Sequence, residues 1–258
     1  TRAGDFPLAQ RLAAAIADGG KPDALAVEAL SCRGVARAFA ADEEGARADL
    51  ERAVELARGL GNDRAMAVAH GSLAIALQRT GHGREAREAY EAALAAAEAA
   101  KDAWTVATTR LNLAVLAQGE GDVARALGHL EAAVDMGRRA GALMAVQQAL
   151  LNLANLDLYL GRYARAEASI QSLVEARASL GPAARAQLLG LQAELAARTG
   201  DLSRGAQLYE LTAEAWEAVG RPLDGAEARL EGILTRARLP GADATALEIE
   251  LAGVGKRL

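Results

Sequence analysis

The side chains most often used for catalysis or metal binding are few and scattered in this sequence. The three histidines are His70, His82 and His129, and no two of them lie at the spacing of a metal-binding pair. Cys32 is the only cysteine, and its apolar surroundings predict a small buried side chain. No glycine-rich run leads into the Lys and Ser or Thr of a phosphate-binding loop. We therefore predict that the chain is not an enzyme and uses no cofactor or metal.

Polar side chains suited to hydrogen bonding with a polypeptide recur at a fixed interval. Ser72, Asn112 and Asn152 follow one another at a constant spacing of about 40 residues, as equivalent positions of a repeat would. A carboxamide carries both a donor and an acceptor, so a column of such groups can pair with the main chain of an extended peptide. The alternative is that these groups brace the fold through hydrogen bonds to backbone carbonyls of neighbouring elements. The set predicted to lie on or beside this face is Ser72, Gln78, Thr108, Asn112, Gln118, Gln148, Asn152, Asn155, Tyr159 and Gln187.

The elements that must position this set are repeats of about 40 residues, a period within the range of helical solenoids. Each repeat has two amphipathic stretches joined by a turn, and the turns are Gly81-His82, Gly121-Asp122, Gly161-Arg162 and Gly200-Asp201. A glycine in this position suits the left-handed conformation that closes a helix, and an Asp after it can cap the next one. The spacing therefore predicts pairs of helices.

The second helix of each pair carries a small, a large and a small residue on one face. In the repeat that follows Gly121, these are Ala126, Leu130 and Ala133. In the fifth repeat the equivalent residues are Gly205, Tyr209 and Thr212, so the pattern persists with local changes. Small residues allow close approach, so we expect the helices to cross at these positions.

Glycine and proline between the repeats complete the predicted map. Pro182 and Pro222 suit the first turn of a new helix. The expected elements are a lone helix at 6–18, helix pairs at 22–60, 62–100, 102–140, 142–180 and 182–220, and a weaker terminal pair at 222–258. We predict that 1–258 form a single solenoid domain. Because Thr1 falls within the repeat pattern, we expect this domain to be a fragment of a longer protein.

Composition and charge narrow the class of partner. Hydrophobic residues make up 52% and aromatic residues only 3%, which favours thin seams between Ala- and Leu-rich helices over one aromatic core. The net charge of −5 disfavours nucleic acid, because phosphate contacts require clustered basic residues. No apolar run is long enough to span a membrane, and one cysteine fits a reducing compartment, so we predict a cytoplasmic protein.

The pattern resembles the tetratricopeptide repeat family, in the 40-residue form found in kinesin light chains, spindle-orientation adaptors and the sensor arms of MalT-type bacterial regulators. The resemblance covers nearly the whole chain and rests on Leu113-Ala114, Gly121-Asp122, Ala126, Leu130 and Ala133, with their counterparts in other repeats. It implies an all-α, right-handed solenoid of antiparallel helix pairs. It also implies that the first helices line a concave groove, which the polar set would face.

These observations predict a scaffold that binds a protein or peptide partner in its groove. The alternative function is the sensory arm of a larger signalling protein, such as an ATPase-type transcription regulator or a kinase, that detects a small ligand or a partner. In that case further domains of the same polypeptide would be partners of this chain. Neither function involves nucleic acid or a membrane.

Overall fold

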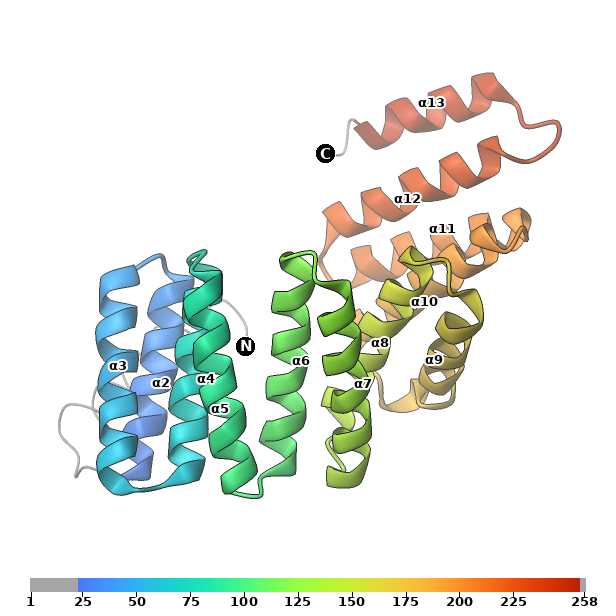
Figure 1. Cartoon of the computed structure of the whole chain (residues 1–258). Helices are drawn as coiled ribbons and strands as arrows, with labels where there is room; N and C mark the ends of the chain where they lie inside the picture. The colour runs from blue at the N-terminus through green and yellow to red at the C-terminus, as the bar shows by residue number, and fades with distance from the viewer. Residues whose placement is uncertain (1–22, 256–258) are drawn as a thin grey trace. The chain divides into compact units, whose positions relative to one another are not determined.

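The computed structural model describes residues 23–255, and every regular element in that range is helical. Successive helices are joined by short turns and run in opposite directions (Figure 1). The predicted all-α arrangement of antiparallel helix pairs is thus confirmed. The lone helix predicted at 6–18 lies outside the described residues. The chain divides into two compact units, Thr1–Val146 and Gln147–Leu258.

The described part of the first unit contains three helix pairs. They are α2 (Ala24–Phe39) with α3 (Glu43–Leu60), α4 (Asp63–Arg79) with α5 (Gly83–Ala99), and α6 (Ala103–Gly119) with α7 (Val123–Ala140). The members of each pair pack against each other, and α4 also contacts α2 and α6. Helix α8 (Leu143–Tyr159) begins at the end of this unit and continues into the next.

The second unit contains the rest of α8 and five further α-helices. These are α9 (Tyr163–Glu175), α10 (Pro182–Arg198), α11 (Leu202–Ala218), α12 (Pro222–Ala237) and α13 (Ala244–Gly255), with a short 3₁₀ turn, η1 (Arg177–Ser179), after α9. Helix α11 packs against both α10 and α12. Among the described helices of both units, none is long and apolar enough to cross a bilayer.

The turn chemistry predicted from the sequence is confirmed. Gly81, Gly121, Gly161 and Gly200 have φ between 70° and 97°, the left-handed region that a residue without Cβ adopts at little cost. Asp122 then caps α7, since its carboxylate accepts a hydrogen bond of 3.0 Å from the backbone N–H of Arg125. Ala41 and Lys101 hold left-handed conformations too, although neither is a glycine.

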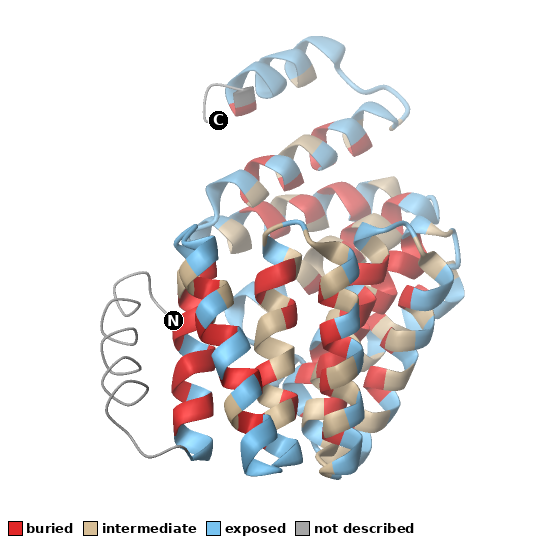
Figure 2. Cartoon of the chain, turned by 60° about the vertical axis from the view of Figure 1, so that its left-hand side comes forward, coloured by how far each residue is buried: buried red, intermediate tan, exposed pale blue. Residues whose placement is uncertain are grey.

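The helix crossings also follow the predicted pattern of small and large residues. Ala126, Leu130 and Ala133 are completely buried, and the equivalent positions of the other repeats are buried as well. Figure 2 shows buried residues recurring along the packed helices, whereas the last helix, near the C-terminus, is mostly exposed. In the fifth repeat, a Cβ on Gly205 would come within 3.1 Å of the backbone nitrogen of Ala197. The absence of that atom lets α11 lie close to α10.

A buried ion cluster joins α2 to α3. Asp49 is 5% exposed and accepts hydrogen bonds from Arg33, at 2.6 and 2.7 Å, and from Arg37, at 2.8 Å. Both carboxylate oxygens are therefore engaged by guanidinium groups. Charged hydrogen bonds of this geometry offset the cost of removing the groups from water.

Two features differ from the sequence-based expectation. Cys32 is exposed, so its predicted burial is wrong: α3 and α4 pack on the faces of α2 that carry Leu30 and Gly34, and Cys32 lies on the opposite face. Helix α9 ends at Glu175, short of the predicted boundary at 180. The last helix, α13, begins at Ala244 after a turn at Gly241, within the weaker terminal pair expected at 222–258.

Candidate functional site

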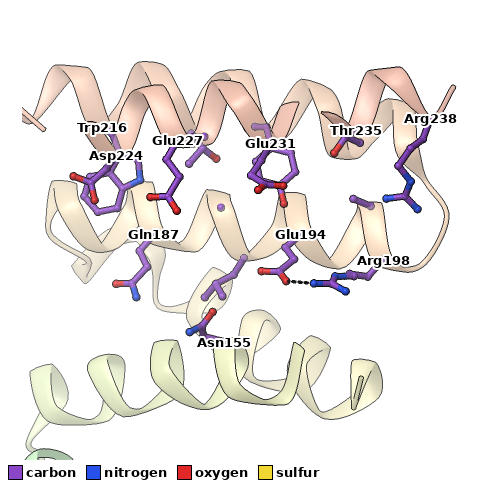
Figure 3. A pocket seen from close by; sticks show the side chains of 16 residues that line it. Asn155, Gln187, Glu194, Arg198, Trp216, Asp224, Glu227, Glu231, Thr235 and Arg238 are labelled. Atoms are coloured by element: carbon purple, nitrogen blue, oxygen red, sulfur yellow. Dashed lines mark hydrogen bonds and ion pairs between the residues drawn. The ribbon is translucent and has the colours of Figure 1, made fainter. Parts of the chain in front are cut away.

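The second unit has a groove of about 760 Å³ whose walls are α10 and α12 and whose floor is α11 (Figure 3). Asn155 of α8 lies at its margin. The residues that line it are Asn155, Gln187, Gly190, Leu191, Glu194, Ala197, Arg198, Tyr209, Thr212, Trp216, Asp224, Glu227, Ala228, Glu231, Thr235 and Arg238.

The α12 wall is a polar stripe on one face of the helix. Asp224, Glu227, Glu231, Thr235 and Arg238 follow one another at intervals of three or four residues, the spacing that aligns side chains along a helix. The stripe covers about 21 Å at 1.5 Å per residue, which is the length of about six residues of extended chain. A short peptide segment therefore matches the groove in length.

The α10 wall presents Gln187, Glu194 and Arg198, with Gly190 and Leu191 between them. Arg198 donates a hydrogen bond of 3.3 Å to Glu194, four residues earlier. This pair is exposed on the wall and contributes little to stability, because water screens the attraction. The residues that line the groove at the Gln187 end of this wall carry no charge.

The floor of the groove is less polar. Tyr209 and Trp216 contribute aromatic rings from α11, and Leu191, Ala197 and Ala228 add aliphatic side chains from the two walls. Burial raises the pKa of Tyr209, and the nearby carboxylate of Glu194 raises it further, so the phenol stays neutral at physiological pH. An apolar floor beneath polar walls is a common arrangement at sites that bind a polypeptide.

Charge is unevenly distributed along the groove. Four carboxylates, from Glu194, Asp224, Glu227 and Glu231, face two guanidinium groups, from Arg198 and Arg238. Figure 3 shows Asp224 and Glu227 towards one end and the two arginines towards the other. Asp224 accepts a hydrogen bond of 2.8 Å from Arg221 and Glu194 is paired with Arg198, whereas Glu227 and Glu231 form no ion pair with a described residue.

Five of the ten residues predicted from the sequence lie in the first unit and do not line this groove. Ser72, Gln78, Thr108, Asn112 and Gln118 are all half-buried. The Tyr90 hydroxyl donates a hydrogen bond of 2.9 Å to the Gln78 carbonyl, so this amide braces α4 against α5. Thr108 donates to the carbonyls of Trp104 and Thr105 within its own helix. The Gln78 contact joins the two helices of one repeat, and the Thr108 contacts stay within one helix, so neither is a hydrogen bond to a backbone carbonyl of a neighbouring repeat.

The other five lie in the second unit, and the groove brings two of them together. Asn155 and Gln187 both line it, and neither forms a hydrogen bond with another described residue. Gln148 donates a long hydrogen bond of 3.5 Å to Asn152 along α8, outside the groove lining. Tyr159 is 78% exposed and also lies outside the lining.

The acidic residues of α12 were not among the predicted site residues, although a signal for them is present. Glu227 and Gln187 occupy equivalent positions of successive repeats, and so do Arg238 and Arg198. The repeat spacing that places Gln187 on the predicted binding face therefore places Glu227 on it too. Glu227 was not predicted because only uncharged polar residues were selected at these repeat positions.

The three histidines do not come together in one site. His70 and His129 lie on α4 and α7, and burial lowers the pKa of both, with Arg58 and Arg110 lowering them further. His82 forms a contact of 2.9 Å with the Thr80 hydroxyl. Within the described range 23–255, no group of three or more His, Cys, Asp or Glu residues has the arrangement of a metal site.

Comparison with known structures identifies the fold. BtubC (BKLC) from P. vanneervenii is similar over 84% of this chain and 89% of its own, with 21% identity and a TM-score of 0.70. A Podosopora anserina putative kinesin light chain with nearly identical TPR-like repeats is similar over 74% of this chain and 95% of its own, with 17% identity and a TM-score of 0.61. The chain has the tetratricopeptide-type repeat fold.

A third similar structure was determined with a bound molecule. This is a Rap protein complexed with Competence and Sporulation Factor, which matches 88% of this tetratricopeptide-type chain and 65% of its own, with 14% identity and a TM-score of 0.57. No protein-family model matches the sequence. No curated protein matches it in sequence either.

Proposed function

We propose that the chain is a protein-interaction module whose groove in the second unit binds an extended peptide segment of a partner protein. The observation that carries the proposal is the pair of unused carboxamides, Asn155 and Gln187, beside an apolar floor. Each carboxamide can donate to a backbone carbonyl and accept from a backbone N–H of a bound segment. Gln78, in contrast, uses its carbonyl to bond Tyr90 within the fold.

The size of the groove and the comparisons support the same proposal. A length of about six extended residues suits a linear segment better than a folded surface. The fold is shared with a Rap protein that was crystallised with Competence and Sporulation Factor, so a fold of this type can hold a binding partner. The proposal includes no catalytic step, and a cytoplasmic location stays a prediction.

The test is a selection of random twelve-residue peptides displayed on phage against the immobilised full chain. Affinities of the enriched peptides are then measured by fluorescence anisotropy for the wild type and for the double variant Asn155→Ala/Gln187→Ala. We expect the double variant to bind about tenfold more weakly, because each lost hydrogen bond costs roughly 0.5–1.5 kcal/mol.

The matched control is Gln207→Ala, which removes an exposed amide from α11 outside the groove. It should leave the affinities within twofold of the wild type. Enriched peptides that bind the Asn155→Ala/Gln187→Ala variant as tightly as the wild type would contradict the proposal, and so would a selection that enriches no peptide. Circular dichroism of each variant verifies that its helices are intact.

A further inference from the structure

The groove has an acidic wall that the fold itself does not neutralise. Glu227 and Glu231 are exposed on α12, line the groove, and form no hydrogen bond or ion pair with a described residue. The Arg198 guanidinium is already paired with Glu194 on the opposite wall. A segment that enters the groove therefore meets two available carboxylates.

A hydroxyl in the same wall has no partner among the described residues either. Thr235 is only 4% exposed and lines the groove one turn beyond Glu231 (Figure 3). Its side chain forms no hydrogen bond with a described residue. Thr212, on the floor, differs because its hydroxyl donates to the Leu208 carbonyl at 2.8 Å. The Thr235 hydroxyl is therefore available to hydrogen-bond the main chain of a peptide in the groove.

We propose that the segment bound in this groove is cationic, with Lys or Arg at alternate positions opposite Glu227 and Glu231. This inference rests on the proposed function and specifies the chemistry of the partner. The two carboxylates are four residues apart on a helix, which separates them by about 6 Å along its axis. Side chains at positions i and i+2 of an extended peptide lie on one face, about 6.6–7 Å apart, so alternate basic residues meet both carboxylates.

The rest of the groove fits the same occupant. The aliphatic stems of Lys and Arg pack on apolar surface while their charged ends reach outward, and the half-buried Trp216 ring provides such surface in the groove. Arg238 lies towards the end away from Asp224, which favours one direction of binding (Figure 3). The overall charge of −5 adds a weaker, long-range attraction for a basic segment.

The test uses the peptides selected on the full chain. Those whose binding depends on Asn155 and Gln187 should be enriched in Lys and Arg relative to the library, with basic residues at alternate positions. Replacing these basic residues by Gln in the tightest peptide should weaken it about tenfold or more. The variant Glu227→Gln/Glu231→Gln should weaken the original peptide by a similar factor, as expected for two partly exposed ion pairs.

Two further variants complete the design. Glu214→Gln removes an exposed carboxylate of α11 outside the groove and should change the affinity less than twofold. Thr235→Val keeps the shape of the side chain but removes its hydroxyl, and should weaken binding about threefold.

The failure of this inference differs from the failure of the proposed function. Groove-dependent peptides that are neutral or acidic would overturn the cationic segment and leave the peptide groove standing. If the Glu227→Gln/Glu231→Gln variant binds the selected peptide with unchanged affinity, the cationic segment is likewise overturned and the peptide groove still stands. The absence of any groove-dependent peptide would overturn both proposals. Affinity for a basic peptide should also fall as salt rises from about 0.05 to about 0.3 M, and salt-independent binding would contradict the proposed ion pairs.

Discussion

At the scale of single residues, Ala41 occupies a backbone conformation that most residues avoid. Its φ is 62°, and it stands where later repeats have Gly81 and Gly121. A left-handed conformation costs a residue with Cβ roughly 1–2 kcal/mol relative to glycine. Part of this advantage of glycine is offset, because glycine loses more conformational entropy when the chain folds. The exposed position of Ala41 leaves this backbone cost as the main term.

We therefore expect Ala41→Gly to raise the free energy of unfolding by about 0.5–1 kcal/mol, measured by urea denaturation. The reciprocal change, Gly121→Ala, should lower it by about 1 kcal/mol, because it places a Cβ at φ 77°. A stabilising effect of Gly121→Ala would show that these turns are not held in the left-handed conformation.

His70 makes stability depend on pH. Burial and the charge of Arg58 lower its pKa below the ordinary value of 6.5, and its Nδ1 is buried without a hydrogen-bond partner among the described residues. As the pH falls below about 6.5, the unfolded chain takes up a proton before the folded chain does. The contribution to stability is thus present above about pH 6.5 and is lost as the pH falls towards the folded-state pKa.

Unfolding free energies measured at pH 7.5 and 5.5 test this sign. The wild type should be less stable at pH 5.5, and His70→Gln should lose less stability over the same interval, because it cannot take up the proton. His129→Gln should reduce the loss further when it is combined with His70→Gln, since burial lowers the pKa of His129 as well. Equal losses in the wild type and both variants would contradict this assignment.

At the scale of elements, the Asp49 cluster fixes α3 against α2. Replacing Asp49 by Asn keeps the shape but removes the buried carboxylate charge to which both Arg33 and Arg37 donate. Removing one partner from a buried ion pair is strongly destabilising, so we expect a loss of about 3 kcal/mol in the free energy of unfolding. The control Asp135→Asn breaks an exposed pair with Arg139 on α7 and should cost at most about 0.5 kcal/mol.

The helices were largely predictable because local chemistry determines them. Gly121 and Asp122 mark the end of one helix and the start of the next, and both do so through their own backbone and side-chain geometry. The end of α9 at Glu175 was not predictable, because the sequence has no strong helix breaker between Glu175 and Gly181. At Gly181 the backbone is extended, as expected for a residue that precedes a proline. Exposure of Cys32 was missed because it depends on which faces of α2 find a neighbour.

The candidate site could be predicted only in part, for a physical reason. Asn155 and Gln187 were found because an amide on a repeated helix face has few uses besides binding and bracing. Glu227 and Glu231 were not predicted, because an exposed carboxylate on a helix usually contacts only water. Their significance appears once the groove places them beside an apolar floor and the unpaired Thr235 hydroxyl.

At the scale of the whole molecule, two compact units share one repeat chemistry but differ in what they offer a partner. In the first unit, Gln78 and Thr108 use hydrogen-bonding groups within the fold, whereas the second unit has the groove with unused amides. One continuous solenoid over 1–258, and a role as the sensory arm of a larger protein, stay predictions. Under either function, we expect the ligand to enter the groove of the second unit.

The chain has two tryptophans, which allows the most direct measurement of where a peptide binds. Trp216 lines the groove, and Trp104 lies exposed on α6 in the first unit. Titrating a selected peptide without aromatic residues into Trp104→Phe should change the Trp216 emission, with a midpoint equal to the Kd from anisotropy. The same titration into Trp216→Phe should leave the Trp104 emission unchanged. A saturable change of Trp104 with a silent Trp216 would contradict binding in the groove.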